Sequence, residues 1–304
     1  MENVSGRVAV VTGGSSGIGR GIALAFARAG ARTVVTGRRR DTLDATAAAF
    51  AEEGLELHTI SADVTDLDAM YAAADEVESR FGRVDILVNN AGIGLTGPVA
   101  DATPDDWNWV IDVNIRGVGN GIQAFLPKIR AHGEGGHIVN TSSMAALMPI
   151  VAGLYSMTKG AIVALSEAMH IELREAGIGV SAYCPGPVHS DIARNAAYRP
   201  EKYATSGYTP RSPESVATAR LQPYMTAEEA GDRVLQGVLR GDMFILTHPE
   251  FKEGVVTRHR AIEAAFPDEP LDEARAAAIP FLTSSPAYSP ENRLPAPKPP
   301  VNAP

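Results

Sequence analysis

The sequence has little of several features that would place it in a special class of protein. It contains a single cysteine, Cys184, which excludes an internal disulfide. Its seven histidines follow no metal-ligand spacing such as HExxH, so no metal site is expected. No apolar run approaches the roughly 18 residues of a membrane span, and the first residues lack the basic and apolar segments of a secretory signal. We therefore expect a cytoplasmic protein with no membrane partner.

Basic charge is also scarce. The 27 lysines and arginines are outnumbered by 36 acidic residues, and the only long basic run covers residues 38–40. We therefore expect no nucleic acid and no anionic membrane surface as main partner. Hydrophobic residues form 45% of the 304 and charged residues 21%, which is typical of a globular protein with a packed core.

Short β-branched runs alternate with segments of helical period from residue 7 to about residue 186. The expected strands cover residues 7–13, 32–37, 55–63, 84–92, 137–143 and 178–186, and the expected helices cover 17–29, 41–53, 66–81, 104–131 and 154–176. Most of these strands are continuous apolar runs, which is typical of strands covered on both faces. The alternation predicts an α/β fold with a doubly wound parallel sheet. Asp41 and Thr103 are expected to cap two of the helices.

The last third of the chain is less regular. A helix at about 226–240 and an apolar run at 243–247 would add a seventh strand. Residues 187–225 show no clear period, which fits either a functional lid or a disordered segment. Eight of the 21 prolines lie in residues 280–304, where regular helix and central strand are excluded. We expect a single domain over residues 1–265, including the lid, and a C-terminal extension over 266–304.

A glycine-rich turn joins the first expected strand to the first helix. The glycines leave the backbone without side chains where it would face a ligand. The positive end of the helix dipole stabilises an anion at the same place. The turn therefore predicts a pyrophosphate site in a Rossmann fold. Its spacing differs from GxGxxG, and many such turns only join a strand to a helix. The residues expected to bind the cofactor in this turn are Gly13, Ser15, Ser16, Gly17, Ile18 and Gly19.

The end of the second strand bears on which dinucleotide binds. An NAD site usually has an acidic residue there, whereas this chain has Gly37, Arg38 and Arg39. A guanidinium can bind a phosphate through two hydrogen bonds, which favours NADP and leaves NAD as the alternative. The same residues also fit a solvated basic turn at the start of a helix.

Tyr155 and Lys159 lie four residues apart in an expected helix and so share a face. A phenol of pKa about 10 is a poor base at neutral pH, but a nearby ammonium lowers that value. Tyr155 is then a candidate for proton transfer to or from a substrate oxygen. The pattern also fits a packed tyrosine with Lys159 in solvent.

Several further motifs occur in a fixed order. They are TGGSSGIG (12–19), Asp63-Val64, NNAG (89–92), Asn114, NTSS (140–143), YSMTK (155–159) and PGPVHS (185–190). Together they resemble the short-chain dehydrogenases/reductases, strongly over about 1–190 and loosely beyond. The resemblance implies hydride transfer between a nicotinamide cofactor and a carbon that bears oxygen.

The resemblance also implies a role for each matching residue. Tyr155 would be the general acid/base, and Lys159 would lower its pKa and hold the nicotinamide ribose. Asn114 would maintain a water relay from Lys159, and Ser143 would hydrogen-bond the substrate oxygen. Ser142 is the alternative, because many members have thirteen residues from serine to tyrosine. The remaining implied cofactor contacts are Asp63, Val64, Asn90, Ala91, Gly92, Pro185, Gly186, Val188 and Ser190.

The substrate region is expected at about 144–154 and 187–225, where apolar residues are frequent and acids are few. These residues are Met144, Leu147, Met148, Ile150, Val151, Leu154, Ile192, Tyr198, Tyr203, Tyr208 and Tyr224. They predict a bulky or aromatic secondary alcohol or ketone as the small-molecule substrate. The alternatives are a reductase of carrier-bound 3-oxoacyl groups and an NADP-binding regulator without turnover.

The resemblance further implies a homodimer or homotetramer, because the helices expected at 104–131 and 155–176 commonly form family interfaces. Trp107 and Trp109 are expected to be packing or subunit-contact residues. Cys184 is expected to be a buried apolar residue, and His189 a half-exposed loop residue.

Overall fold

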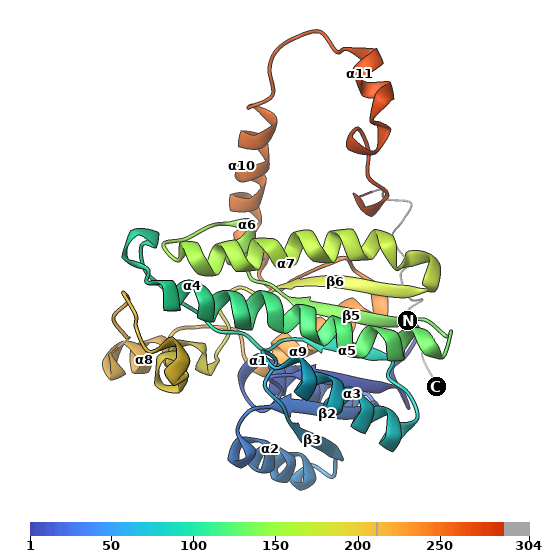
Figure 1. Ribbon diagram of the computed structural model, residues 1–304, viewed down its shortest axis with the longest axis vertical. Coiled ribbons are helices and arrows are strands. Elements are labelled where there is room, and N and C mark those ends of the chain that lie inside the picture. Colours follow the sequence, from blue (N-terminus) through green and yellow to red (C-terminus); the bar gives the residue numbers. More distant parts are fainter. Residues whose placement is uncertain (211, 289–304) are drawn as a thin grey trace, which may run out of the picture.

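The computed structural model describes residues 1–210 and 212–288 (Figure 1). Seven parallel strands form one sheet in the order β3-β2-β1-β4-β5-β6-β7. The strands are β1 (Val8–Thr12), β2 (Arg32–Gly37), β3 (Leu57–Ser61), β4 (Ile86–Asn89), β5 (Gly136–Thr141), β6 (Ile178–Cys184) and β7 (Phe244–Leu246). The doubly wound parallel sheet predicted from the sequence is confirmed, including its seventh strand. Because the strand order reverses between β1 and β4, a crevice is expected at their carboxyl ends.

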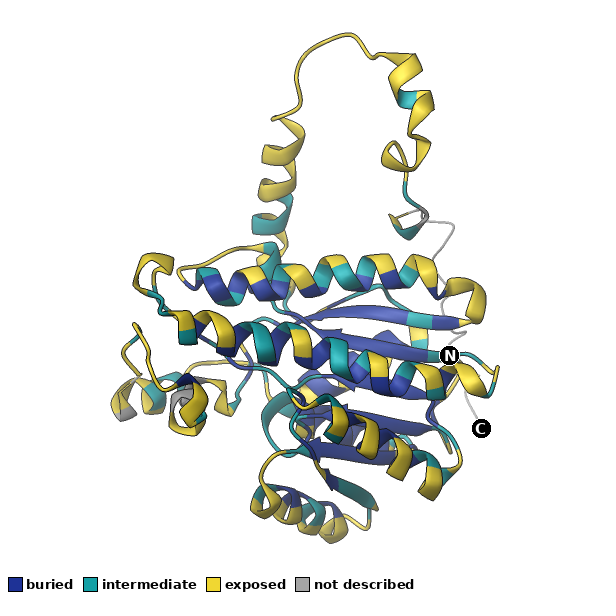
Figure 2. Cartoon of the chain, in the orientation of Figure 1, coloured by how far each residue is buried: buried dark blue, intermediate teal, exposed yellow. Residues whose placement is uncertain are grey.

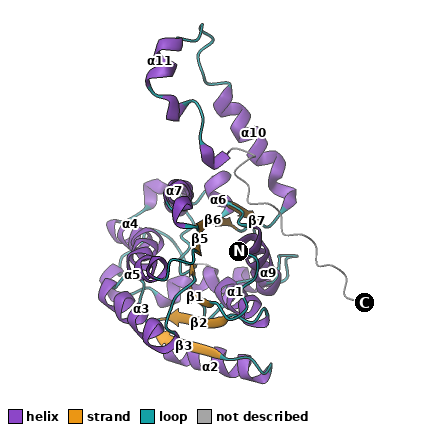
Figure 3. Cartoon of the chain, turned by 90° about the vertical axis from the view of Figure 1, so that its right-hand side faces the viewer, coloured by secondary structure: helices purple, strands orange, loops and turns teal. Residues whose placement is uncertain are grey.

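Helices cover both faces of the sheet (Figure 3). One face is covered by α1 (Gly17–Arg28), α2 (Arg40–Glu52) and α9 (Ala227–Arg240). The other is covered by α3 (Leu67–Phe81), α4 (Pro104–Ile111), α5 (Gly117–Ala131) and α7 (Gly153–Glu172). Large side chains such as Phe26 and Phe125 are fully buried between helices and sheet. This burial of apolar surface supplies the main driving force for the fold.

The region expected to be one helix over 104–131 is divided. A π-helical turn, Asp112–Arg116, separates α4 from α5 and contains Asn114. Such turns interrupt the regular hydrogen-bond ladder and occur often at functional sites. Hydrophobic periodicity alone did not reveal this interruption, because the apolar face continues through it.

The two capping predictions had different outcomes. Thr103 is the N-cap of α4, as predicted, and the structure adds a reciprocal capping box with Asp106. The prediction for Asp41 was wrong. Helix α2 begins at Arg40, so Arg39 occupies the N-cap and Asp41 falls within the first turn. A carboxylate there still interacts favourably with the helix dipole.

Residues 187–225 form a folded segment over the carboxyl ends of the strands. It contains two 3₁₀ helices, Asp191–Tyr198 and Glu201–Tyr203, and helix α8 (Pro213–Arg220). Its two ends are joined, because Val188 pairs with Met225 and the His189 amide donates to the Met225 carbonyl over 2.9 Å. The segment is therefore a loop closed at its base, and we refer to residues 187–225 as the lid.

Beyond β7 the chain leaves the body. Helices α10 (Lys252–Glu263) and α11 (Glu273–Ala278) project from it as an arm that contains no buried residue (Figures 1 and 2). The arm returns to α7, where the Tyr288 hydroxyl donates to Glu167 over 2.7 Å. The proline-rich tail from residue 289 onward lies outside the described residues. Within 1–210 and 212–288, every helix is too short or too polar to cross a membrane.

Candidate active site

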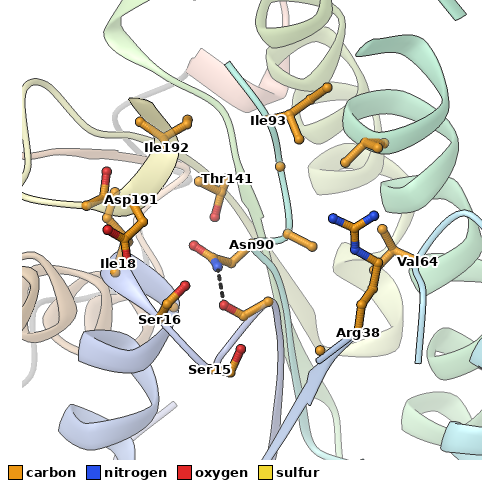
Figure 4. Close-up of a pocket in the computed structure, with 18 of the residues that line it drawn as sticks. Ser15, Ser16, Ile18, Arg38, Val64, Asn90, Ile93, Thr141, Asp191 and Ile192 are labelled. Carbon is orange, nitrogen blue, oxygen red and sulfur yellow. Dashed lines mark hydrogen bonds between the residues drawn. The ribbon is translucent and has the colours of Figure 1, made fainter. Parts of the chain in front are cut away.

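A cavity of about 240 Å³ opens at the carboxyl ends of the central strands, beneath the lid. Figure 4 shows Ser15 and Ser16 on one side of it, Arg38 and Val64 on another, and Asp191 and Ile192 above. Most of the predicted site residues border it: Gly13, Ser15, Ser16, Gly17, Ile18, Gly19, Arg38, Arg39, Asp63, Val64, Asn90, Ala91, Gly92, Tyr155, Lys159, Pro185 and Ser190. Asn114, Ser143, Gly186 and Val188 are not among the bordering residues, whereas Ser142, the alternative to Ser143, is.

The glycine turn has the geometry that a pyrophosphate cradle requires. Gly13 and Gly17 have φ values of +64° and +50°, a region that side chains disfavour. A Cβ on Gly13 would lie 2.9 Å from the Ala91 Cα, and a Cβ on Gly17 would lie 3.1 Å from Ser190. Helix α1 starts directly after the turn, so its free amides face the cavity. The residues present therefore fit a dinucleotide phosphate group.

The loop after β4 is braced against this turn. The Thr12 hydroxyl accepts hydrogen bonds from the amides of Asn90 and Ala91 over 3.0 and 3.1 Å. The Asn90 side chain donates in turn to the Thr12 carbonyl over 3.1 Å and to that of Gly13 (Figure 4). These contacts fix two walls of the cavity relative to each other before any ligand binds.

The Asn114 side chain holds the same loop after β4 through hydrogen bonds. Its amide oxygen accepts from the Ile93 amide over 2.8 Å, and its amide nitrogen donates to the Ile93 carbonyl over 3.0 Å and to Thr158 over 3.1 Å. A Cβ added to Gly92 would lie 3.3 Å from the Asn114 Oδ1 and 3.4 Å from the Lys159 Nζ. Asn114 therefore positions the loop next to Lys159.

The carboxyl end of β2 brings Arg38 and Arg39 to one end of the cavity. No acidic residue ends β2, and Arg38 lies 3.8 Å from the Asp63 carboxylate. Val64 is held by a hydrogen bond from Asn120 to its carbonyl over 2.8 Å. Arg39 sits at the start of α2 and borders the cavity. The combination places two arginines and one carboxylate at this end of the cavity.

Tyr155 and Lys159 lie on the first turns of α7. The Lys159 ammonium is 5.6 Å from the Tyr155 ring centroid and donates to the Thr141 carbonyl over 2.8 Å. Lys159 is 4% exposed, and burial lowers its pKa to about 8. At neutral pH the ammonium form still predominates, so a positive charge stands beside the phenol.

The predicted effect of Lys159 on the pKa of Tyr155 was wrong. Proximity to Lys159 was expected to lower the pKa of Tyr155, but burial raises it above its ordinary value. The only opposing influence is a hydrogen bond with the Ser143 side chain. Desolvation dominates because the phenol is enclosed by the cavity walls while the ammonium group bonds to Thr141 instead.

The two candidate serines are now distinguishable by their contacts. The Ser142 hydroxyl is buried and donates to the Lys159 carbonyl over 2.7 Å. Ser143 is half-buried, caps α6 (Met144–Leu147) and bonds with Tyr155. Ser142 therefore has a structural partner, whereas Ser143 shares a hydrogen bond with the phenol.

The predicted substrate lining was only partly correct. Ile192 and Tyr198 border the cavity, but Leu154 is in the core and Tyr203 is buried with its hydroxyl 2.5 Å from Asp112. The remainder, Met144, Leu147, Met148, Ile150, Val151, Tyr208 and Tyr224, also lie outside the cavity lining. Apolar side chains that sequence reasoning did not assign to it, Ile93, Trp109 and Val113, line it instead.

An anchor for the lid was also missed. Asp106 is fully buried, and it accepts hydrogen bonds from Arg199 over 2.8 Å, from Ser206 over 2.8 Å and from the Gly207 amide over 3.0 Å. Burial alone would raise the pKa of Asp106, but the hydrogen bond from the Thr103 amide together with these contacts lowers it to about 2. The sequence predicted the Thr103 cap of α4 but carried no signal for partners about a hundred residues away.

Three other expectations can be compared with the structure. Cys184 is fully buried, and burial raises its pKa to about 12, which agrees with an inert apolar role. His189 is half-exposed as expected. Trp109 is 1% exposed and packs under Arg199, so it is a packing residue rather than a subunit contact, while Trp107 remains exposed.

Comparison with known proteins agrees with this geometry. The model of the short chain dehydrogenase family matches residues 7–200. A C alpha-dehydrogenase of Sphingobium sp. is 38% identical over 266 residues, which cover 86% of this chain and 87% of that protein. Oxidoreductase UcpA of Escherichia coli K12 is 36% identical over 220 residues, covering 72% and 80%.

A solved structure gives the same result for the fold. A short chain dehydrogenase/reductase from Burkholderia phymatum, in complex with NAD, superposes with a TM-score of 0.80 at 33% identity, covering 90% of this chain and all of that one. Family membership implies a nicotinamide cofactor. With its parallel sheet, glycine turn and paired tyrosine and lysine, the chain belongs to the short-chain dehydrogenases/reductases.

Proposed function

We propose that this oxidoreductase transfers a hydride between a nicotinamide dinucleotide and a secondary alcohol or ketone. The observation that carries the proposal is the position of Tyr155 and Lys159 in the same cavity as the glycine turn. One continuous space therefore joins a phosphate cradle to a proton-transfer pair. A regulator that only binds nucleotide has no need of that pair.

The proposed roles follow from the contacts. In the reduction, the Tyr155 hydroxyl donates its proton to the substrate oxygen, and the same group accepts it back in the oxidation. Ser143, which shares a hydrogen bond with Tyr155, holds the substrate oxygen and stabilises the charge that develops there. Lys159 supplies a fixed positive charge beside the phenol. When bound, the nicotinamide supplies the hydride donor or acceptor.

NADP is the proposed cofactor. The support is local: Arg38 and Arg39 border the cavity at the end of β2, where no carboxylate repels a 2′-phosphate. The complex with NAD belongs to a relative from Burkholderia phymatum and supports a nicotinamide cofactor in general. Arg38 exchanges its distant Asp63 partner for the phosphate in this proposal.

The proposed substrate is bulky and hydrophobic. Ile93, Val113 and Ile192 border the cavity, and apolar walls favour an apolar substrate. The relative named C alpha-dehydrogenase supports a dehydrogenase that acts on one carbon of a larger molecule. The lid, anchored through Asp106, then excludes water from the reacting groups.

Initial rates with NADPH and NADH against aliphatic, aryl and polycyclic ketones test these proposals together. We expect the highest kcat/KM with NADPH and an aryl or polycyclic ketone. Equal rates with both coenzymes, or a preference for NADH, contradict the assignment of Arg38 and Arg39. Activity confined to small charged substrates contradicts the apolar pocket.

The same proposal includes a homo-oligomer, a dimer or tetramer, acting in the cytoplasm. The arm supports it, because α10 and α11 contain no fully buried residue, and the segments that follow each of them expose Phe266, Leu271, Phe281 and Leu282. A second copy of the chain is the proposed cover for these apolar side chains. Sedimentation analysis should give a dimer or tetramer that Phe281→Ser with Leu282→Ser weakens. A monomer at micromolar concentration contradicts this.

A further inference from the structure

The lid reaches the adenosine end of the cavity as well as the substrate end. Ser190 and Asp191 lie against the glycine turn, and Tyr198, at the other end of the same 3₁₀ helix, borders the cavity beside Arg39. The Arg39 guanidinium carbon is 4.2 Å from the Tyr198 ring centroid. A lid residue thus contacts an arginine proposed to recognise the cofactor.

The Arg39 guanidinium lies over the Tyr198 ring, and its N–H groups form no hydrogen bond or ion pair within residues 1–210 and 212–288. A guanidinium stacks on an aromatic ring through its planar face and binds phosphate oxygens through the N–H groups at its edge. Arg38 and Arg40 have carboxylate neighbours in Asp63 and Asp44. Within the described part of the chain, Arg39 has the Tyr198 ring as its side-chain contact instead. Its edge is therefore the one most available to an incoming phosphate.

The position of Tyr198 is fixed by its neighbour. Arg199 is 11% exposed, pairs with the buried Asp106 over 2.8 Å and lies 4.7 Å over the Trp109 ring. The Arg199 guanidinium also donates to the carbonyl oxygens of Tyr203 and Thr205. Tyr198 is therefore presented from an anchored point of the lid rather than from a free loop.

We propose that Tyr198 is a specificity residue for the cofactor: by stacking on Arg39 it orients that guanidinium toward the ribose 2′-phosphate and couples closing of the lid to the presence of this phosphate. The inference rests on the proposed preference for NADP. Because coupling between two sites is reciprocal, a phosphate that restrains Arg39 also stabilises the lid in contact with it.

Nucleotide fragments without nicotinamide test this without any turnover. The probes are 2′,5′-ADP, which carries the 2′-phosphate, and 5′-AMP, which lacks it. Calorimetry on native protein should show tighter binding of 2′,5′-ADP. Tyr198→Leu should weaken 2′,5′-ADP about two- to fivefold, the range of a solvent-exposed cation–π contact, and leave 5′-AMP unchanged. Tyr198→Phe keeps the ring and should match the native protein.

A double-mutant cycle separates coupling from simple loss of a contact. Arg39→Gln should lower the affinity for 2′,5′-ADP, and adding Tyr198→Leu should cause no further loss. Hydrogen exchange of backbone amides in 191–203 should slow with 2′,5′-ADP more than with 5′-AMP in native protein, and this difference should vanish in Tyr198→Leu.

The outcomes distinguish the two proposals. If native protein binds both fragments equally, the NADP preference is wrong and the role of Tyr198 falls with it. If native protein prefers 2′,5′-ADP and Tyr198→Leu keeps the full preference and the full lid protection, the inference alone is overturned.

Discussion

The Lys159 ammonium donates a hydrogen bond to the Thr141 carbonyl over 2.8 Å, and this bond joins α7 to the carboxyl end of β5. It holds the charge in the cavity wall, 5.6 Å from the Tyr155 ring centroid. Lys159 therefore cannot swing into solvent, which a surface lysine on α7 would do. The proposed reaction depends on this restraint.

The pH dependence of reduction should follow Lys159. Burial lowers its pKa to about 8, so the positive charge is present below that pH and is lost above it. We expect the rate at saturating ketone to be level near pH 7 and to fall as pH rises through about 8. Lys159→Arg keeps its charge, so its remaining activity should show no such fall. A native rate that stays constant to pH 9.5 contradicts the role of the ammonium.

The two serines should respond differently to alanine substitution. Ser143→Ala removes the hydroxyl that bonds with Tyr155 and should lower kcat about 100-fold or more. Ser142→Ala removes a buried bond to the Lys159 carbonyl and should lower the free energy of unfolding by about 1 kcal/mol. Steady-state kinetics and urea unfolding of both variants decide between them. A larger kcat loss in Ser142→Ala would reverse the assignment.

Two glycine substitutions test the phosphate cradle. A Cβ on Gly19 would overlap the Gly13 carbonyl and the Asn90 amide, so Gly19→Ala should weaken dinucleotide binding at least about tenfold. Gly119 lies in α5 with open space around it, and Gly119→Ala should leave binding intact and stabilise the helix by about 0.5–1 kcal/mol. Fluorescence titration with NADPH measures the first effect. Unchanged affinity in Gly19→Ala places the nucleotide elsewhere.

The sheet could be predicted from the sequence because its strands are continuous apolar runs bounded by turn residues. Val8–Thr12 and Ile86–Asn89 are fully buried, as such runs imply. The glycine turn and the Tyr155–Lys159 pair were also visible, since each depends on residues close together in the chain. Local spacing is what a single sequence records best.

The features that the sequence did not predict depend on distant partners. The π-helical turn at Asn114 keeps an apolar face and so leaves no mark in the periodicity. The lid shows no clear hydrophobic period because it is held in place by hydrogen bonds to Asp106, which is far away in the chain. It is not held by a continuous apolar face of its own. The raised pKa of Tyr155 arises from burial, which adjacency to a lysine does not reveal.

Breaking the lid anchor should affect both stability and substrate binding. Asp106→Asn leaves Arg199 buried without its carboxylate, which should lower the free energy of unfolding by about 3 kcal/mol and raise the KM for ketone. Asp105→Asn, next to it but outside the buried pair, should cause a smaller loss.

The acid dependence of this stability has a defined sign. Because the pKa of Asp106 is lowered to about 2, its contribution is complete above pH 4 and is lost as pH falls toward 2. The stability difference between native protein and Asp106→Asn should therefore shrink between pH 4 and pH 2 in urea titrations. A difference that is constant over that range contradicts the anchor.

The most direct measurement is the single-turnover rate of ketone reduction by Tyr155→Phe, with NADPH affinity determined on the same sample. Tyr71→Phe, an exposed tyrosine of α3, is the matched control. We expect Tyr155→Phe to bind NADPH as the native protein does and to reduce the ketone at least about 100-fold more slowly. Reduction at the native rate would show that the Tyr155 hydroxyl carries no proton in this reaction.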